Sequence, residues 1–108
     1  MQVRDYLNIP YILLAQPVES EDGDWKRRLS FPELGDFYAE GTDVEEVFLA
    51  VERLRITEIL RRIKAGELPP VPRAPLETAD PAWWAKFLGI GDEVTKHLDK
   101  SAEAFQRD

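Results

Sequence analysis

Four carboxylates near the ends of predicted strands are the residues whose types and spacing could support catalysis. Asp22, Asp24, Glu33 and Asp36 follow one another within a short part of the chain. Carboxylate oxygens are ligands that Mg²⁺ prefers, so a metal-dependent nuclease would need a group of this kind. Asp22 and Asp24, however, flank Gly23, where turn formation alone explains both acids. Turn formation is therefore the better interpretation, and a nuclease is the least favoured of the candidate functions.

Other catalytic patterns are weaker still. His97 is the only histidine, and no serine is placed beside it as a nucleophile would be. Such a lone histidine is typical of a surface or capping group. Gly89 and Gly91 lack the surrounding pattern of a phosphate-binding loop. The chain has no cysteine, so disulfides and thiolate metal sites are impossible. We therefore predict no enzymatic activity, no cofactor and no metal.

The charge of the chain indicates which partners suit it. Its 108 residues include 14 basic and 21 acidic side chains, a formal net charge of −7. An acidic surface repels nucleic-acid phosphates and attracts basic proteins, although acidity also serves solubility alone. Lys26, Arg27 and Arg28 could contact nucleic acid, but cross-strand pairing with acids is the better interpretation.

Targeting signals are not evident in the sequence. No apolar run approaches the roughly 20 residues of a membrane span. The start, MQVRDYLN, is unlike a secretion signal because Asp5 and Asn8 interrupt it. We expect a cytoplasmic protein without a membrane partner.

Two strands and a turn are predicted in the first third of the chain. Residues 9–18, IPYILLAQPV, form a β-rich run whose middle is apolar on both faces, which favours a central or doubly covered strand. Asp22-Gly23 is a favoured pair for a tight hairpin turn. Residues 25–31, WKRRLSF, alternate between two faces, and Pro32 ends this strand. Residues 37–40 form a short third strand.

One long helix, from Asp43 to Ala65, is predicted next. Thr42 and Glu45 fit a capping box at its start, and Gly66 fits its end. The helix carries two apolar stripes. The first consists of Val44, Val47, Phe48, Val51 and Leu54, and the second of Leu49, Ile56, Leu60 and Ile63. One stripe should cover the sheet, and the other must be buried by the C-terminal segment or by another chain.

The C-terminal part begins with residues 69–75, PPVPRAP, which suit an extended edge segment or a stiff linker. Asp80 and Pro81 then start a short helix that ends at Gly89, and a second helix is expected from about Asp92 to Phe105. The aromatic residues of the first helix either fold back onto the second stripe or form an interface with it. The candidate partner or oligomer interface is therefore Leu49, Ile56, Leu60, Ile63, Trp83, Trp84 and Phe87.

These elements define an α/β fold of the α+β type. Residues 1–75 form a small, mainly antiparallel sheet of three or four strands covered by one long helix. Residues 76–108 form a helical C-terminal extension that is not an independent domain.

Several motifs in this order resemble the HicB family of antitoxins. They are the turn EDGDW, the bend FPEL, the helix entry YAEGTDVEEV and the exit GELPPVP, over roughly residues 9–75. The chain departs from the family at Gly35-Asp36, where Pro-Gly is usual. It also departs in residues 76–108, where Lys86, Lys96, Lys100 and Arg107 are outnumbered by acids. The DNA-binding appendage of many members is therefore not expected.

The resemblance implies a HicB-like sheet and helix and an antitoxin function. Such a protein neutralises a small, basic, RNA-cleaving toxin by occluding its active surface, usually as an oligomer. The alternative is a HicB-like homo-oligomeric scaffold or regulator without a toxin. A DNA-binding repressor ranks below both.

Overall fold

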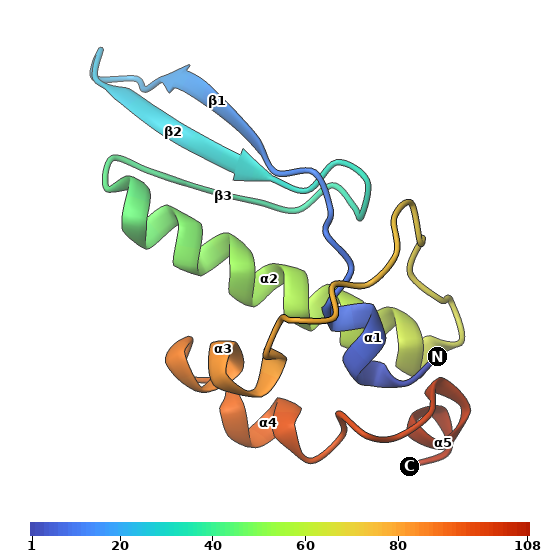
Figure 1. Cartoon of the computed structure of the whole chain (residues 1–108). Coiled ribbons are helices and arrows are strands. Elements are labelled where there is room, and N and C mark those ends of the chain that lie inside the picture. The colour runs from blue at the N-terminus through green and yellow to red at the C-terminus, as the bar shows by residue number, and fades with distance from the viewer.

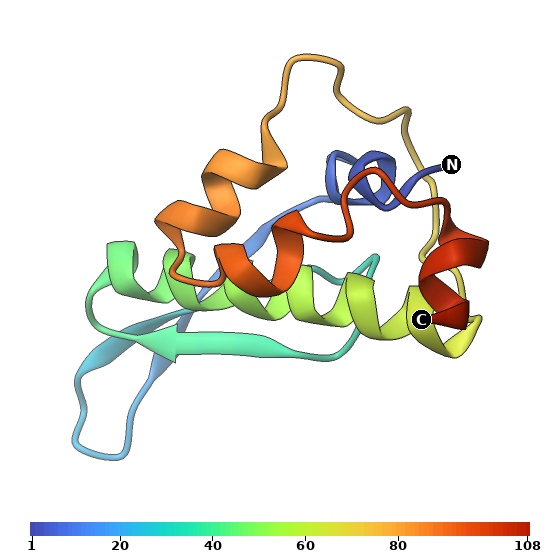
Figure 2. The same ribbon diagram turned by 90° about the horizontal axis from the view of Figure 1, so that it is seen from below.

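The computed structural model describes residues 1–108 and has an α+β fold, as predicted (Figure 1). The elements are α1 (Val3–Leu7), β1 (Leu14–Glu19), β2 (Trp25–Ser30), β3 (Tyr38–Gly41), α2 (Val44–Ala65), α3 (Pro81–Phe87), α4 (Gly91–Thr95) and α5 (Ala102–Arg107). The sheet contains three antiparallel strands in the order β1-β2-β3. The long helix α2 lies against one face of the sheet, and the short helices α3, α4 and α5 lie on the side of α2 away from the sheet (Figure 2).

The hairpin between β1 and β2 forms where the turn pair predicts it. Leu14 pairs with Ser30 at one end of the ladder and Glu19 with Trp25 at the other. Gly23 has φ +87°, a left-handed conformation that glycine adopts without steric cost. The Ser20 amide donates to the Asp24 carbonyl at 2.7 Å, which closes the turn. The prediction of two antiparallel strands joined by a tight turn is confirmed.

The predicted position of the first strand is wrong. β1 begins at Leu14 rather than residue 9, and it is an edge strand rather than a central one. Ile12, Leu13 and Leu14 are 50%, 39% and 40% exposed. The physical reason is that α2 packs mainly against β2 and β3, which leaves β1 beyond the cover of the helix. An apolar run alone does not determine how many of its sides are covered.

Helix α2 matches its prediction to within one residue, except at its cap. The Asp43 carboxylate accepts from the amides of Glu45 at 3.0 Å and Glu46 at 3.3 Å, so Asp43 is the N-cap. The predicted Thr42–Glu45 capping box is wrong because the helix starts one residue later than that box requires. Gly66, with φ +78°, ends the helix as predicted.

Apolar residues of both predicted stripes are buried, because α2 lies between the sheet and the short helices. The buried apolar residues of α2 are Val47, Val51, Ile56, Ile59 and Ile63. Val44 is 53% exposed and Leu54 38% exposed, so the first stripe is buried only in part. The second stripe packs within the same chain, because α1 and α5 both lie against α2.

The proline-rich residues 69–75 are an extended linker and not a strand. The Tyr11 hydroxyl donates to the Pro70 carbonyl at 2.7 Å. Arg73 bonds the Glu33 carboxylate at 2.9 Å and the Pro10 carbonyl at 3.1 Å. The linker is therefore fixed along residues 10–11 and the bend after β2. Helix α3 then begins as predicted, with the Asp80 side chain accepting from the Trp83 amide at 3.1 Å.

The predicted helix from Asp92 to Phe105 is wrong. The structure has α4, ending at Thr95, and α5, beginning at Ala102 and capped by Ser101. The residues between them bond the N-terminal segment instead: Val3 donates to Lys100 at 2.9 Å and Arg4 to Leu98 at 3.0 Å. Helix α1 was not predicted. Both chain ends consequently lie side by side at one end of the molecule (Figure 1).

Residues 1–75 and residues 76–108 share one apolar core. Its cluster of buried residues includes Leu34, Val51 and Ile59 from the first 75 residues, and Leu88 and Leu98 from the rest. The helices of the structure are too short or too polar for any of them to cross a lipid bilayer.

Candidate interaction surface

The acidic residues considered for catalysis do not converge. Asp22 and Asp24 lie in the exposed hairpin turn, where the Ser20 hydroxyl donates to Asp22 and lowers the pKa of its carboxyl group. Glu33 is held by Arg73, the main cause of its lowered pKa, and accepts from the Ile12 amide at 2.8 Å. No group of three or more His, Cys, Asp or Glu side chains could hold a metal ion.

His97 packs against α5. Its ring centre lies 4.6 Å from that of Phe105, and Nδ1 lies 3.1 Å from Lys100 Nζ. Burial, followed by the charge of Lys100, lowers the pKa of this imidazole, which favours its neutral form. His97 is therefore a half-buried packing residue rather than a cap.

The basic run on β2 takes part in cross-strand pairing through Arg28. Arg28 Nε donates to Glu40 at 2.7 Å across the β2–β3 ladder, and its guanidinium lies 4.4 Å from the centre of the Tyr38 ring. The cross-strand prediction is thus confirmed for Arg28.

The predicted interface residues separate into two groups. Ile56 and Ile63 are 2% and 0% exposed and belong to the core, while Leu49 and Leu60 are half-buried against it. These four residues of α2 therefore do not form a surface. Trp83 and Phe87, by contrast, are 61% and 59% exposed.

Trp83, Trp84 and Phe87 form what we call the α3 aromatic patch. The Phe87 ring lies 5.6 Å from Trp83 and 5.5 Å from Trp84, with interplanar angles of 16° and 8°. Trp84 anchors the patch, because it is half-buried and its indole N–H donates to Glu52 Oε1 at 2.9 Å. The patch is a stacked aromatic surface open to solvent on its outer side.

A further apolar surface connects the patch to the sheet and was missed from the sequence. The Phe48 ring lies 6.1 Å from Trp84, and Phe48 and Leu13 line the same pocket. We call Leu13, Phe48, Trp84 and Phe87 the apolar band. The apolar run around Leu13 was visible in the sequence, but its composition predicted burial.

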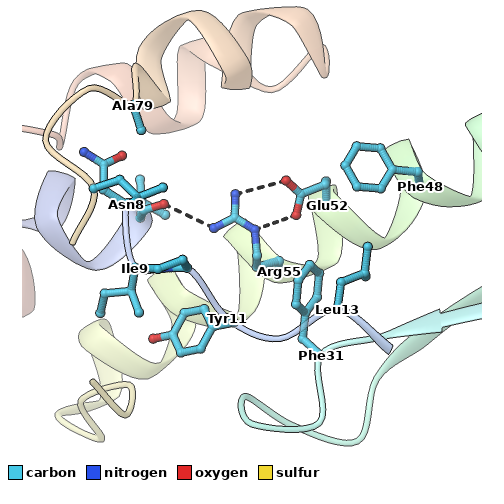
Figure 3. A pocket seen from close by; sticks show the side chains of 12 residues that line it. Asn8, Ile9, Tyr11, Leu13, Phe31, Phe48, Glu52, Arg55 and Ala79 are labelled. Carbon is cyan, nitrogen blue, oxygen red and sulfur yellow. Dashed lines mark hydrogen bonds and ion pairs between the residues drawn. The ribbon is translucent and has the colours of Figure 1, made fainter. Parts of the chain in front are cut away.

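The pocket beside the band has a volume of about 260 Å³ (Figure 3). Leu13, Phe31 and Phe48 form an apolar side, and Asn8, Glu52 and Arg55 provide its polar groups. A second pocket of about 230 Å³ lies next to it and reaches Trp83 and Trp84. Leu7, Asn8, Arg55 and Ala79 line both pockets, so the two form one hollow between α1, α2 and α3.

A buried ion pair lines this hollow. Arg55 Nε lies 2.5 Å from Glu52 Oε2, and the two side chains are only 10% and 11% exposed. Arg55 also donates to Glu52 Oε1 at 3.3 Å and to the Leu7 carbonyl at 3.2 Å (Figure 3). With Trp84 bonded to the same carboxylate, the pair connects α1, α2 and α3. A helical Glu–Arg pair three residues apart is usually read as a surface pair, so the sequence did not indicate this one.

Comparison of the chain with protein-family models, curated proteins and solved structures found no match.

Proposed function

We propose that this protein is a HicB-like antitoxin, a cytoplasmic binding module that occludes a small, basic, RNA-cleaving toxin. The observation that carries the proposal is the exposed α3 aromatic patch on a chain of net charge −7. The role is one of binding, without a cofactor or catalytic residues of its own.

The aromatic patch suits the centre of a protein interface. Tryptophan and other large aromatic side chains dominate interface energies when a partner desolvates them. Trp83 and Phe87 are more than half exposed, yet both rings already stack on Trp84. A partner would therefore lose little side-chain entropy on binding them.

The acidic character of the chain supports a basic partner. Glu19, Glu21 and Asp22 gather at the hairpin tip, and Glu40 of β3 lines the same recess. Such a region attracts a basic protein over long range and raises the rate of encounter.

The order of elements also supports the antitoxin proposal. An acidic-glycine hairpin, a proline-containing bend, a short third strand and a long capped helix follow one another between Leu14 and Ala65. The motifs that resemble HicB antitoxins lie at these places. Residues 76–108 pack against α2, and their acids outnumber their basic residues, so a DNA-binding role is not favoured.

A homo-oligomeric scaffold or regulator without a toxin is the second candidate. The outer edge at the start of β1, before Pro17, favours it because unpaired strand edges invite pairing with another chain. Leu13 and Leu14, about two-fifths exposed, lie at that place.

Co-expression with the products of neighbouring small genes, followed by light scattering of the purified complex, tests the proposal. We expect a tight complex with a basic partner of under about 100 residues, the size of one small domain. Trp83→Ala combined with Phe87→Ala should weaken this complex at least tenfold. Tyr38→Ala, at a 50% exposed aromatic residue on the other face of the sheet, is the matched control. A homo-oligomer without any such partner would support the second candidate instead.

A further inference from the structure

The outer edge of β1 carries backbone groups that bond nothing in the chain. β2 is the only strand next to β1, so the opposite edge of β1 is free (Figure 1). Leu13, just before the strand, has no hydrogen-bond partner for its backbone amide or carbonyl. At the other end of β1, the Ser20 amide bonds the Asp24 carbonyl across the hairpin. Because backbone bonds alternate along an antiparallel strand, Ala15 also turns its amide and carbonyl away from β2.

Such a row of groups is complementary to another polypeptide backbone. A strand rises about 3.4 Å per residue, so Leu13 and Ala15 present their N–H and C=O groups about 7 Å apart. An extended chain repeats its own donors and acceptors at this interval and can bond both residues at once, as an added strand. Both residues are exposed, and Pro17, which has no N–H, ends the row. The edge therefore suits a short extended segment of polypeptide.

The apolar band lies beside this edge. The Leu13 side chain belongs to both, because it lies next to Phe31 on the α2 side of the sheet and lines the same pocket as Phe48 (Figure 3). The Phe48 ring in turn lies 6.1 Å from Trp84 of α3. Side chains alternate between the two faces of a strand, so every second side chain of an added strand lies on the side of the band. The segment that fits is therefore apolar at alternate positions.

The charge near the edge favours a basic partner over a second copy of the chain. Four acids line the recess at the hairpin end of β1, with Lys26 as its only base: Glu19, Glu21, Asp22 and Glu40. A segment that lies along β1 and continues past its end comes close to these acids, which attract basic residues there. Two copies of the chain, each with a net charge of −7, repel one another instead.

We propose that the outer edge of residues 13–15 binds an extended segment of the basic partner as a fourth strand of the sheet. The inference rests on the proposed binding function and specifies the form in which the partner is recognised. The partner segment bonds the backbone of Leu13 and Ala15 and places its apolar side chains on the apolar band. Its basic side chains lie towards the acidic hairpin tip.

A short capped peptide tests the edge without any knowledge of the partner. The probe is acetyl-Lys-Leu-Thr-Leu-Lys-amide, which as a strand has its leucines on one face and its lysines on the other. It is added to the full ¹⁵N-labelled chain, and the backbone amide signals of Leu13 and Ala15 are followed by NMR. We expect saturable downfield shifts of both amide protons, because both gain a hydrogen bond, with a roughly millimolar dissociation constant.

Two altered peptides separate the contributions of backbone and charge. The same peptide with N-methyl groups on its three central residues cannot donate backbone hydrogen bonds from them, and it should bind about fivefold more weakly or worse. The peptide with glutamate in place of both lysines should also bind more weakly at low ionic strength, because the hairpin tip is acidic.

Two variants at one residue make the test specific. Ala15→Pro removes the outward N–H group, and the Leu13 signal should then show peptide binding weakened about fivefold or more. The strand already holds Pro17 in the same outer row, and Ala15 is exposed, so the substitution leaves the β1–β2 ladder intact. Ala15→Val is the matched control, since valine has as many side-chain carbons as proline but keeps the N–H group, and it should bind the peptide as the wild type does.

Several outcomes would overturn the inference. They are the absence of saturable shifts at Leu13 and Ala15, equal binding of either altered peptide, and unchanged binding in Ala15→Pro. Shifts of the same signals with rising protein concentration alone, together with a doubled mass in light scattering, would assign the edge to a second copy of the chain. A basic-partner complex that is equally tight in Ala15→Pro would reject the edge and leave the proposed function intact. Peptide binding at the edge without any basic partner would do the reverse.

Discussion

At the scale of single residues, Glu52 and Arg55 are the buried charges on which three helices depend. Glu52→Gln leaves the Arg55 charge without its counter-ion in a site where the side chain is only 10% exposed. We expect a loss of roughly 3–5 kcal/mol in the free energy of unfolding, because an unpaired buried charge is costly. Urea unfolding monitored by tryptophan fluorescence measures it.

A surface pair provides the control for this substitution. Asp99 accepts from Arg4 at 3.0 Å, but its side chain is 83% exposed. Asp99→Asn should cost under about 1 kcal/mol. The double variant Glu52→Leu/Arg55→Met should be more stable than Glu52→Gln, since it removes both charges together. Equal losses in Glu52→Gln and Asp99→Asn would contradict the view that the buried pair holds the helices together.

Glu58 makes the stability of the protein sensitive to acid. Arg61 and Arg62 donate to its carboxylate at 2.8 Å and 2.9 Å. These hydrogen bonds, the one from Arg61 most strongly, lower the pKa of the Glu58 carboxyl group from 4.5 to about 2. The folded-state pKa is depressed, so this stabilisation is complete above pH 4.5 and is lost as the pH falls towards 2. We expect a loss on the order of 1–2 kcal/mol over that range.

The measurement is the free energy of unfolding at several pH values, for the wild type and for Glu58→Gln. The variant lacks the titrating carboxylate, so its stability should fall less steeply between neutral pH and pH 3. Parallel curves for the two proteins would show that other carboxylates, such as Glu33, account for the acid sensitivity.

At the scale of elements, local signals predicted α2, α3 and the hairpin well. Gly66, Asp80-Pro81 and Asp22-Gly23 are each read from a few neighbouring residues, and each ends, starts or turns an element in the structure. The predicted helix from Asp92 failed because its interruption is set by hydrogen bonds to residues 3 and 4, almost the whole chain away. The exposure of β1 at the edge of the sheet likewise depends on which strands α2 covers, and not on the sequence of β1 itself.

The candidate surface was predictable to a similar extent. Trp83 and Phe87 could be proposed from the sequence because the long helix carries a surplus apolar stripe, which an aromatic run could either cover or join in an interface. Ile56 and Ile63 have the same apolar character, and only the position of the short helices shows that they are buried. Asn8 gave no signal, since a single asparagine at the end of a short helix is ordinary.

Pro17 protects the free edge of β1. The Ser20 amide donates to the Asp24 carbonyl, just before β2. Backbone hydrogen bonds alternate along an antiparallel strand, so the backbone N–H groups of residues 14, 16 and 18 also point to β2, while the backbone of residues 15, 17 and 19 faces solvent. Proline interrupts this outer row of N–H groups, a common defence of edge strands. Pro17→Val restores the row and should increase self-association, measured by light scattering at high protein concentration.

The matched control for the edge is Gln16→Val. It introduces the same β-branched side chain one residue earlier, where the amide faces β2. Equal association of the two variants would assign the effect to apolar surface rather than to the added N–H group.

At the scale of the whole molecule, the hairpin and the chain ends lie at opposite ends of an elongated body, 49 Å by 25 Å by 24 Å (Figure 1). Phe105 closes the end that holds both termini. It is 7% exposed, and Lys64 Nζ lies 5.1 Å from its ring centre and bonds its carbonyl at 2.8 Å. The last helix is thereby fixed to the end of α2.

Phe105→Ala should destabilise the protein by roughly 3–5 kcal/mol, as expected for a buried aromatic residue. Phe87→Ala is the same substitution at a 59% exposed site and should change stability by about 0.5 kcal/mol or less. Thermal unfolding compares the two, and hydrogen exchange of α1 should accelerate only in Phe105→Ala. A normal α1 exchange rate in that variant would mean that the two chain ends are held independently.

The pairing of the first residues with the last also determines when the protein can be completed during its synthesis. Arg4 and its partner Asp99 are separated by 95 positions in the chain. At translation rates of about 5–20 residues per second, this interval lasts roughly 5–19 seconds. In the later part of this interval, once α2 has been made up to Ala65, the face of α2 that α5 covers still has no partner from the end of the chain. Every newly made copy therefore passes through an interval in which a chaperone, or a second nascent chain, can reach Ile56 and Ile63.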